Sequence, residues 1–318
     1  MQRAAQAQPN IALIKYWGKR DAERNLPAVG SLSLTLDALD TRMVVEPGAA
    51  EDSLEIDGRP APDMLPRVTR CLDRVAGPER TPAHVSSTSN FPLGAGLASS
   101  ASAFAALVVA AAAAYGRTLD TQELARLAGA ASGSAARSLY GGFVRLDAGD
   151  SDIGLKPLAA PDAWPLQLVI AITEEAPKPV GSTEAMQRSA ATSPFYRSWI
   201  EQQDADLDCA EAAVAARDFG ALAEIAEHNC LKMHSVTWSA RPPVVYWNRA
   251  TLACLQAVRR LQADGVDVFF TIDAGPQLKA VCTADAATDV RAALAATDGV
   301  QRLMETGLGE GARLVNGR

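Results

Sequence analysis

Residues 92–102 read PLGAGLASSAS and stand directly before a long apolar, alanine-rich run. The Gly-x-Gly turn of Gly94 and Gly96 lets backbone N–H groups approach an anion, and a helix that begins just after it adds the positive end of its dipole. Ser99 or Ser100 could cap that helix and also offer a hydroxyl to a phosphate oxygen or to Mg²⁺. A tight turn with simple serine caps explains the same residues, so this stretch alone leaves both interpretations open.

The whole chain has 318 residues, enough for about two domains, and the composition of an ordinary folded protein. Its net charge of −7 disfavours nucleic acid and anionic membranes, so an anionic substrate would need a local basic pocket. The first ten residues lack the apolar core of a secretory signal, and the alanine-rich run is poor material for a membrane span. Five cysteines without close pairing indicate reduced thiols. We therefore expect a cytoplasmic protein that binds neither nucleic acid nor membranes.

The hydrophobic periodicity predicts an α+β architecture with antiparallel sheets, because strands and helices do not alternate strictly. Strand patterns occur at residues 11–15, 31–36, 84–89, 142–147, 166–173 and 266–272, with another near the C-terminus. Helix patterns occur at residues 66–75, 99–115, 121–139 (one or two helices), 182–190, 199–216, 219–234, 243–264 and 284–296. The pattern changes near residue 175, which predicts a first domain of residues 1–175 and a second of residues 176–318.

Three polar residues stand where their chemistry matters. Lys15 shares the inward face of a predicted strand with apolar residues, a costly place for an ammonium unless an anion meets it or the side chain reaches water. Arg137 would share a helical face with Ser134 and suits bidentate binding of a carboxylate, although most arginines simply lie on the surface. Asp273 follows a strand and precedes Ala-Gly-Pro, where a turn residue is the ordinary interpretation.

The phosphate-loop stretch resembles the central motif of the GHMP kinases, and one branch of that superfamily matches better than the rest. Six blocks together resemble the diphosphomevalonate decarboxylase family: NIALIKYWGKRD with NLPAVGSLSLTLD, PLGAGLASSAS, SGSAARSLYGG, GSTEAM, MHSVTWSARPPVVYW and TIDAGPQ. They lie in order from residue 10 to residue 277. The resemblance implies a GHMP kinase fold, in which a domain like that of a ribosomal protein precedes a ferredoxin-like α/β sandwich domain, with the active site in the cleft between them.

The same resemblance implies ATP-dependent decarboxylation of mevalonate 5-diphosphate to isopentenyl diphosphate, through phosphorylation of its 3-hydroxyl, by a homodimer that uses Mg²⁺. It implies catalytic roles for Lys15, for Arg137 as the group that grips the carboxylate, and for Asp273 facing the tertiary hydroxyl. The implied substrate-binding residues are Tyr16, Lys19, Arg67, Ser132, Ser134, Ser182 and Thr183. ATP would lie on Gly94, Ala95, Gly96, Leu97, Ala98, Ser99 and Ser100, with Ser100 also directed toward Mg²⁺.

Some features depart from the family pattern or fall outside it. Ala136 stands where several relatives have cysteine, and Gln277 replaces the usual asparagine. The three histidines, His84, His228 and His234, lack the spacing of metal ligands, so we expect them to be structural. The alternatives are a decarboxylase of mevalonate 5-phosphate, a 3-kinase that stops before decarboxylation, and a catalytically silent module that binds RNA, which the acidic net charge disfavours.

Overall fold

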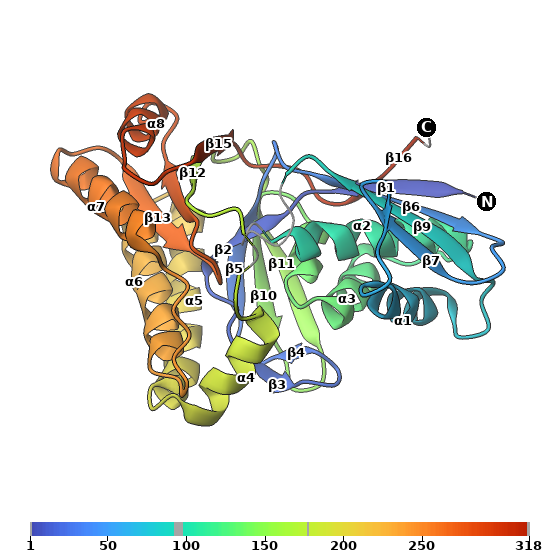
Figure 1. The fold of residues 1–318 in the computed structure, drawn as a ribbon. Helices are drawn as coiled ribbons and strands as arrows, with labels where there is room; N and C mark the ends of the chain where they lie inside the picture. The colour runs from blue at the N-terminus through green and yellow to red at the C-terminus, as the bar shows by residue number, and fades with distance from the viewer. Residues whose placement is uncertain (1, 92–97, 177, 317–318) are drawn as a thin grey trace.

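Three larger sheets organise the computed structural model, which describes residues 2–91, 98–176 and 178–316 (Figure 1). The first contains, in spatial order, β16 (Arg313–Val315), β1 (Arg3–Ala7), β6 (Thr41–Pro47), β9 (Ala83–Ser89), β7 (Ser53–Ile56) and β8 (Arg59–Pro60). The second contains β11 (Ile153–Ala159), β10 (Phe143–Ala148), β5 (Ser31–Thr35) and β2 (Asn10–Ile14). The third contains β13 (Val268–Ile272), β14 (Leu278–Cys282), β12 (Gln167–Ile172) and β15 (Arg302–Thr306). A two-stranded unit, β3 (Lys19–Asp21) with β4 (Leu26–Pro27), completes the described strands.

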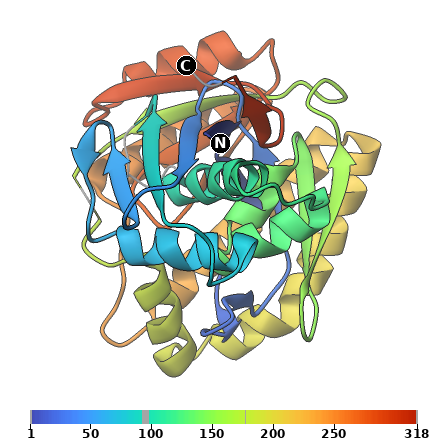
Figure 2. The ribbon, with the colours of Figure 1, turned by 90° about the vertical axis from the view of Figure 1, so that its right-hand side faces the viewer.

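The helices of the first half pack together between one face of the first sheet and strands of the second. They are α1 (Leu65–Ala76), α2 (Ser99–Ala114), α3 (Thr121–Ala131) and the short 3₁₀ helix η1 (Ala135–Leu139). Helix α2 contacts β1 and β6 as well as α1, α3 and η1, so it is buried on most sides. Because α2 is buried on most sides, apolar residues surround the helix and no amphipathic stripe appears. Its many alanines let the neighbouring elements approach closely. Figure 2 shows α1 and α2 in front of the sheet.

Four of the five helices of the second half pack against the second and third sheets, and the first of the five packs on another helix. They are α4 (Ser182–Thr192), α5 (Tyr196–Ala216), α6 (Phe219–Trp238), α7 (Arg249–Ala263) and α8 (Ala287–Ala295). Helix α6 contacts both β2 and β13. One hydrophobic cluster joins side chains from these three elements: Leu13 on β2, Leu222 on α6 and Phe269 on β13. The two halves therefore share a core, which fixes the end of β2 beside the end of β13.

The predicted α+β fold with antiparallel sheets is confirmed, since among the described strands only β7 and β9 pair in parallel. The helix predicted at residues 243–264 begins only at Arg249, because two prolines precede it and the Asn248 side chain caps it. Residues 121–139, predicted to form one or two helices, form α3 and η1 with a break at Ser132. Strand β12 pairs with β14 and β15 in the third sheet, and the boundary near residue 175 stays a prediction.

The prediction that a serine caps α2 is wrong. Ala98 occupies the N-cap position with a left-handed backbone (φ 54°), and its side chain makes no capping hydrogen bond. Ser99 and Ser100 are instead its first two residues. The first N–H groups of a helix have no partner within the helix, so an uncapped start suits an anion.

Candidate active site

A cavity of about 700 Å³ collects side chains from both halves of the chain, within the range of about 300–1,000 Å³ usual for ligand sites. It is lined by every predicted site residue that the structure describes: Lys15, Tyr16, Lys19, Arg67, Ala98, Ser99, Ser100, Ser132, Ser134, Arg137, Ser182, Thr183 and Asp273. The predicted phosphate-loop residues Gly94, Ala95, Gly96 and Leu97 lie outside the described residues. Motifs that are more than 250 positions apart in the sequence thus meet around one space.

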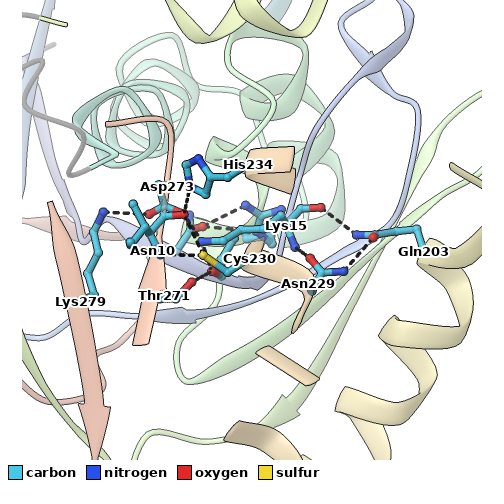
Figure 3. A network of polar contacts seen from close by, with 12 residues as sticks. Asn10, Lys15, Gln203, Asn229, Cys230, His234, Thr271, Asp273 and Lys279 are labelled. Atoms are coloured by element: carbon cyan, nitrogen blue, oxygen red, sulfur yellow. Dashed lines mark hydrogen bonds and ion pairs between the residues drawn. The ribbon is translucent and has the colours of Figure 1, made fainter. Parts of the chain in front are cut away.

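Lys15 and Asp273 form an ion pair beside this cavity (Figure 3). Lys15 Nζ donates to Asp273 Oδ1 at 2.6 Å and to the carbonyl oxygen of Ala12 at 2.8 Å. The Lys15 side chain is only 1% exposed, whereas that of Asp273 is 23% exposed. Lys15 therefore does not reach water, and Asp273 is the member of the pair that is open to a ligand.

A second lysine, Lys279, contacts the same carboxylate and was not predicted from the sequence. Its Nζ lies 3.3 Å from Asp273 Oδ2, and its side chain is fully buried. The signal was present, because Lys279 stands inside the apolar strand LKAVC just as Lys15 stands after NIALI. A lysine within a buried strand demands a counter-ion, and this one finds it in Asp273.

The ionisation of Asp273 follows from these two neighbours. Burial alone would raise the pKa of its carboxyl, but the charges and hydrogen bonds of Lys15 and Lys279 outweigh burial and hold the pKa well below its usual range. Burial and the charge of Lys15 lower the pKa of Lys279, and Asp273 opposes both. Asp273 is therefore a carboxylate throughout the physiological pH range.

Arg137 lies in η1 and is buried without a carboxylate partner among the described ion pairs. Its Nε and Nη2 each donate to Asn10 Oδ1 at 3.2 Å, and Nη1 donates to Ser31 Oγ. Burial lowers the pKa of Arg137 to about 10, although Tyr16 and Asp273 oppose this change. An arginine removed from water and held only by neutral groups is a prepared site for an anion.

Asn10 orients this arginine and is a second residue that the sequence did not reveal. Its amide nitrogen donates to the carbonyl oxygen of Ser134 at 2.9 Å and to Ser138 Oγ at 2.8 Å. The Asn10 oxygen is thereby turned toward Arg137. One asparagine on β2 therefore fixes both the guanidinium and the loop that enters η1.

Tyr16 explains the glycine in Ser132-Gly-Ser134. A Cβ added to Gly133 would stand 2.2 Å from Tyr16 Oη, so only glycine leaves room for the phenol. The hydroxyl is buried and has no hydrogen-bond partner among the described residues, although Tyr16 lines the cavity. Burial raises the pKa of Tyr16 to about 12, so the phenol keeps its proton. It is a hydrogen-bond donor without an acceptor in the described part of the chain, and an anionic ligand would supply one.

Cations gather at one side of the cavity. Lys19 and Arg67 were predicted, and Arg70 and Arg74 on the same face of α1 join them. Arg67 Nη2 and Arg74 Nη1 also donate to the carbonyl oxygens that end α3, at 3.1 and 2.9 Å. Burial and the charge of Arg67 lower the pKa of Lys19, as expected where like charges stand together. This cationic group favours a ligand with several negative charges.

The start of α4 brings a further lysine to the cavity. Lys178 Nζ donates to Ser182 Oγ at 2.7 Å and to the carbonyl oxygen of Ala274 at 3.0 Å. Lys19 Nζ donates to Thr183 Oγ1 at 3.3 Å. The predicted Ser182 and Thr183 are therefore each paired with a lysine, and Lys178 is another cation that the sequence did not reveal.

A pair of buried amides holds the backbone of Lys15 (Figure 3). Asn229 Oδ1 accepts the N–H of Lys15 at 2.7 Å, and Gln203 Nε2 donates to the Lys15 carbonyl oxygen at 2.8 Å. Asn229 Nδ2 also donates to Gln203 Oε1 at 2.9 Å. The two side chains, from α6 and α5, take the place of a partner strand where β2 ends.

This arrangement predicts the effect of one substitution. Gln203→Ala leaves the carbonyl oxygen of Lys15 without its donor, so we expect the free energy of unfolding to fall by about 1–3 kcal/mol and turnover to fall with it. Urea unfolding followed by circular dichroism measures the change. Gln202→Ala, at an exposed position on the same helix, should change stability by less than about 0.5 kcal/mol. Equal effects of the two substitutions would contradict the assigned role.

Comparison with known sequence families shows which proteins this chain is related to. Residues 7–156 match the family described as the diphosphomevalonate decarboxylase-like N-terminal domain, and residues 168–311 match the mevalonate 5-diphosphate decarboxylase C-terminal domain. The chain belongs to the diphosphomevalonate decarboxylase family. It is 35% identical to the diphosphomevalonate decarboxylase of Candida albicans, over 84% of this chain and 80% of that protein. It is 36% identical to the human enzyme of that name, over 84% of this chain and 73% of that protein.

Solved structures of the family agree. The mevalonate diphosphate decarboxylase of Staphylococcus aureus has a TM-score of 0.93 at 31% identity, covering 99% of this chain and 98% of that one. The enzyme of Enterococcus faecalis has a TM-score of 0.91 at 34% identity, covering 100% and 99%. A further relative, solved in complex with MVAPP, AMPPCP and magnesium, has a TM-score of 0.92 at 34% identity over 100% and 99% of the two chains. The GHMP kinase fold is confirmed.

The two departures from the family pattern have different surroundings. Gln277 is fully buried; its oxygen accepts the N–H of Thr173 at 2.7 Å and its nitrogen donates to the carbonyl oxygen of Glu174. It thus ties the end of β12 to β14 and does not line the cavity. Ala136 is buried against Gly129.

The remaining sequence predictions concern metals, thiols and membranes. Within residues 2–91, 98–176 and 178–316 no three His, Cys, Asp or Glu side chains gather in a way that could hold a metal ion. All five cysteines are free, as predicted, and only Cys209 is exposed. No helix of the described chain has the length and apolar character needed to cross a membrane.

Proposed function

We propose that this chain catalyses the ATP-dependent decarboxylation of mevalonate 5-diphosphate, with formation of isopentenyl diphosphate, ADP, phosphate and carbon dioxide, in the mevalonate pathway of isoprenoid biosynthesis. One observation carries the proposal: a carboxylate paired with lysine and a buried arginine without an acid partner face the same cavity in a member of this family. The first suits a hydroxyl that must be phosphorylated. The second suits a carboxylate that must leave as carbon dioxide.

Substrate binding uses the two ends of the cavity. The carboxylate of mevalonate is held by the fork of Arg137, which Asn10 keeps in position, and the hydroxyls of Ser132 and Ser134 lie on the same loop. The diphosphate is held by the cationic group around Lys19 and Arg67, with the unpaired hydroxyl of Tyr16, and by Ser182 and Thr183. Opposite ends then fix the 3-hydroxyl at a central point.

The chemistry at that point has two steps. Asp273, an anion, accepts a hydrogen bond from the 3-hydroxyl and takes its proton as the oxygen bonds to the γ-phosphorus of ATP and the bond to ADP breaks. Lys15 offsets the negative charge nearby. The new phosphate then leaves the tertiary carbon, and the electrons of the bond to the carboxylate carbon form the double bond. Phosphate and carbon dioxide depart, and the low pKa of Asp273 returns the proton readily to solvent.

The start of α2 fits the phosphates of ATP. Ser99 and Ser100 line the cavity at an uncapped helix start, and Ser100 Oγ accepts a hydrogen bond from Ser132 Oγ at 3.3 Å. Ser100 would hold Mg²⁺ together with the phosphates, since this serine is near the helix end that attracts anions. When bound, Mg²⁺ neutralises charge on the β- and γ-phosphates.

The decisive experiment compares substrates. The purified protein with ATP and Mg²⁺ should release one carbon dioxide for each ADP from mevalonate 5-diphosphate, and much less from mevalonate 5-phosphate, which offers less charge to the cationic group. Labelled carbon dioxide and ADP are measured in the same reaction. ADP without carbon dioxide would identify a 3-kinase, and neither product would contradict the proposal.

Three broader expectations belong to the same proposal. We expect the enzyme to work in the cytoplasm as a homodimer and to fold as two domains that meet near residue 175. The acidic net charge supports the absence of nucleic acid among its partners. Light scattering of the purified protein measures its mass in solution and tests the dimer.

A further inference from the structure

Two strands place Lys279 behind Asp273, away from the ligand. In the register of β13 and β14, Lys279 pairs directly with Thr271, so the two side chains lie on one face of the sheet. Asp273 follows Thr271 by two residues and continues that face. Figure 3 shows the carboxylate of Asp273 with Lys279 on one side and Lys15 on the other. Lys15 lines the cavity, whereas Lys279 does not line it.

The positive charges around Asp273 outnumber its single negative charge. The titratable groups around this carboxylate are Lys15 at the end of β2, Lys279 on β14, Arg137 on η1, Lys178 before α4, and Cys230 and His234 on α6. Burial raises the pKa of the Cys230 thiol and lowers that of His234 to about 3, so both are neutral. One carboxylate therefore faces several cations, and two of them touch it.

This surplus of positive charge allows Lys15 and Lys279 to have different roles. If Lys15 were the sole partner of Asp273, turning its ammonium toward a phosphate would leave a carboxylate uncompensated in a partly buried place, which is costly. Lys279 stays in contact with the carboxylate in any case, because it is fully buried and does not line the cavity. Lys15 can then share its charge with an anionic ligand.

We propose that Lys279 is a positioning residue that holds Asp273 as a fixed anion and thereby frees Lys15 to stabilise the phosphoryl group during its transfer. The proposal rests on the proposed function for the identity of the reaction. The arrangement of Lys15, Asp273 and Lys279 is a feature of the structure and does not depend on the proposed function. Lys279 acts through Asp273 and Lys15 and touches no ligand.

The test compares Lys279→Met with Lys279→Arg. Met keeps the length of the side chain and removes the buried charge, so we expect kcat for ADP and carbon dioxide to fall by roughly 10–100-fold while both KM values change little. Lys279→Arg should restore part of the lost rate. Because the loss of Lys279 raises the pKa of Asp273, the acid limb of the profile of kcat/KM must move to higher pH.

Thermal unfolding separates this role from a structural one. Replacement of a buried charge by an apolar side chain of similar volume is often neutral or stabilising, and Asp273 keeps Lys15 as its partner. We therefore expect the Tm of Lys279→Met to equal or exceed that of the wild type although the enzyme is slower. Lys156→Met, which breaks an exposed ion pair with Glu211, is the matched control and should leave both quantities unchanged.

Each outcome bears on the proposal. Unchanged kcat and an unchanged acid limb in Lys279→Met would overturn it. Parallel loss of Tm and kcat with no rescue by Lys279→Arg would also overturn it, because that pattern belongs to a purely structural lysine. If the wild type forms no product from mevalonate 5-diphosphate, the proposed function fails, and ¹³C NMR of the Asp273 carboxyl still tests the inference. Its titration must move to higher pH in Lys279→Met, with Asp273→Asn to assign the signal.

Discussion

Asp273→Asn is expected to lower the formation of both ADP and carbon dioxide by about a thousandfold while leaving ATP binding nearly unchanged. The amide keeps the shape of the side chain but cannot take the proton of the 3-hydroxyl, and it removes the only negative charge that Lys15 and Lys279 contact among the described ion pairs. Steady-state assays of both products, with binding of a non-hydrolysable ATP analogue measured by calorimetry, check the result. Near-normal turnover of the purified variant would contradict the assigned role.

Loss of stability must be separated from loss of chemistry in this variant. The two lysines lose their buried partner, which typically costs about 3–5 kcal/mol, so the single variant should unfold more easily. The double variant Asp273→Asn with Lys279→Met removes one positive charge as well. It should regain much of the stability and none of the activity. Asp264→Asn, at an exposed position, serves as the matched control.

Arg137→Met is expected to lower kcat/KM for the mevalonate substrate by about 100–1,000-fold. Removal of one partner from a buried charge pair typically weakens binding by about 2–5 kcal/mol, because the other charge is left buried without a partner. Arg137 is fully buried and held by Asn10 and Ser31, so its fork is already oriented for a carboxylate. Calorimetric titration with the substrate in the absence of ATP measures the affinity directly.

The same variant should fold. Met fills the space of the arginine stem, and the main structural cost is Asn10 Oδ1 left without a donor, about 1–3 kcal/mol. Arg249→Met, which breaks an exposed pair with Asp298, should leave substrate affinity unchanged. Substrate affinity of Arg137→Met equal to that of the wild type would show that another group holds the carboxylate.

The sequence revealed those parts of the site that can be recognised within one continuous segment of the chain. Lys15 stood out as a charge within an apolar strand, whereas Arg137 and Asp273 looked ordinary by local pattern and were assigned through the family motifs that contain them; all three line one cavity. The long helix α2 and the strands β2, β5 and β9 were predicted from periodicity for the same reason, since each carries its own pattern. Such features depend on neighbours in the chain and can be read locally.

Other parts depend on which strands pair, and no local pattern shows that. Lys279 contacts Asp273 because β14 runs beside β13 in one particular register. Asn10 contacts Arg137 because β2 lies next to η1, 127 positions away. The amides of Gln203 and Asn229 meet Lys15 only because the helices of the second half cover β2. Each of these side chains is ordinary in the sequence and becomes informative when its partner is known.

The pairing of Lys15 with Asp273 across 258 positions has a consequence for how the enzyme comes into being. Synthesis delivers β2 and helix α2 long before the ribosome reaches β13. Until β13 has been made, the chain carries Lys15 without the carboxylate of Asp273. The Lys15–Asp273 pair, and with it the phosphoryl transfer that we propose, therefore requires a chain that has been synthesised past β13.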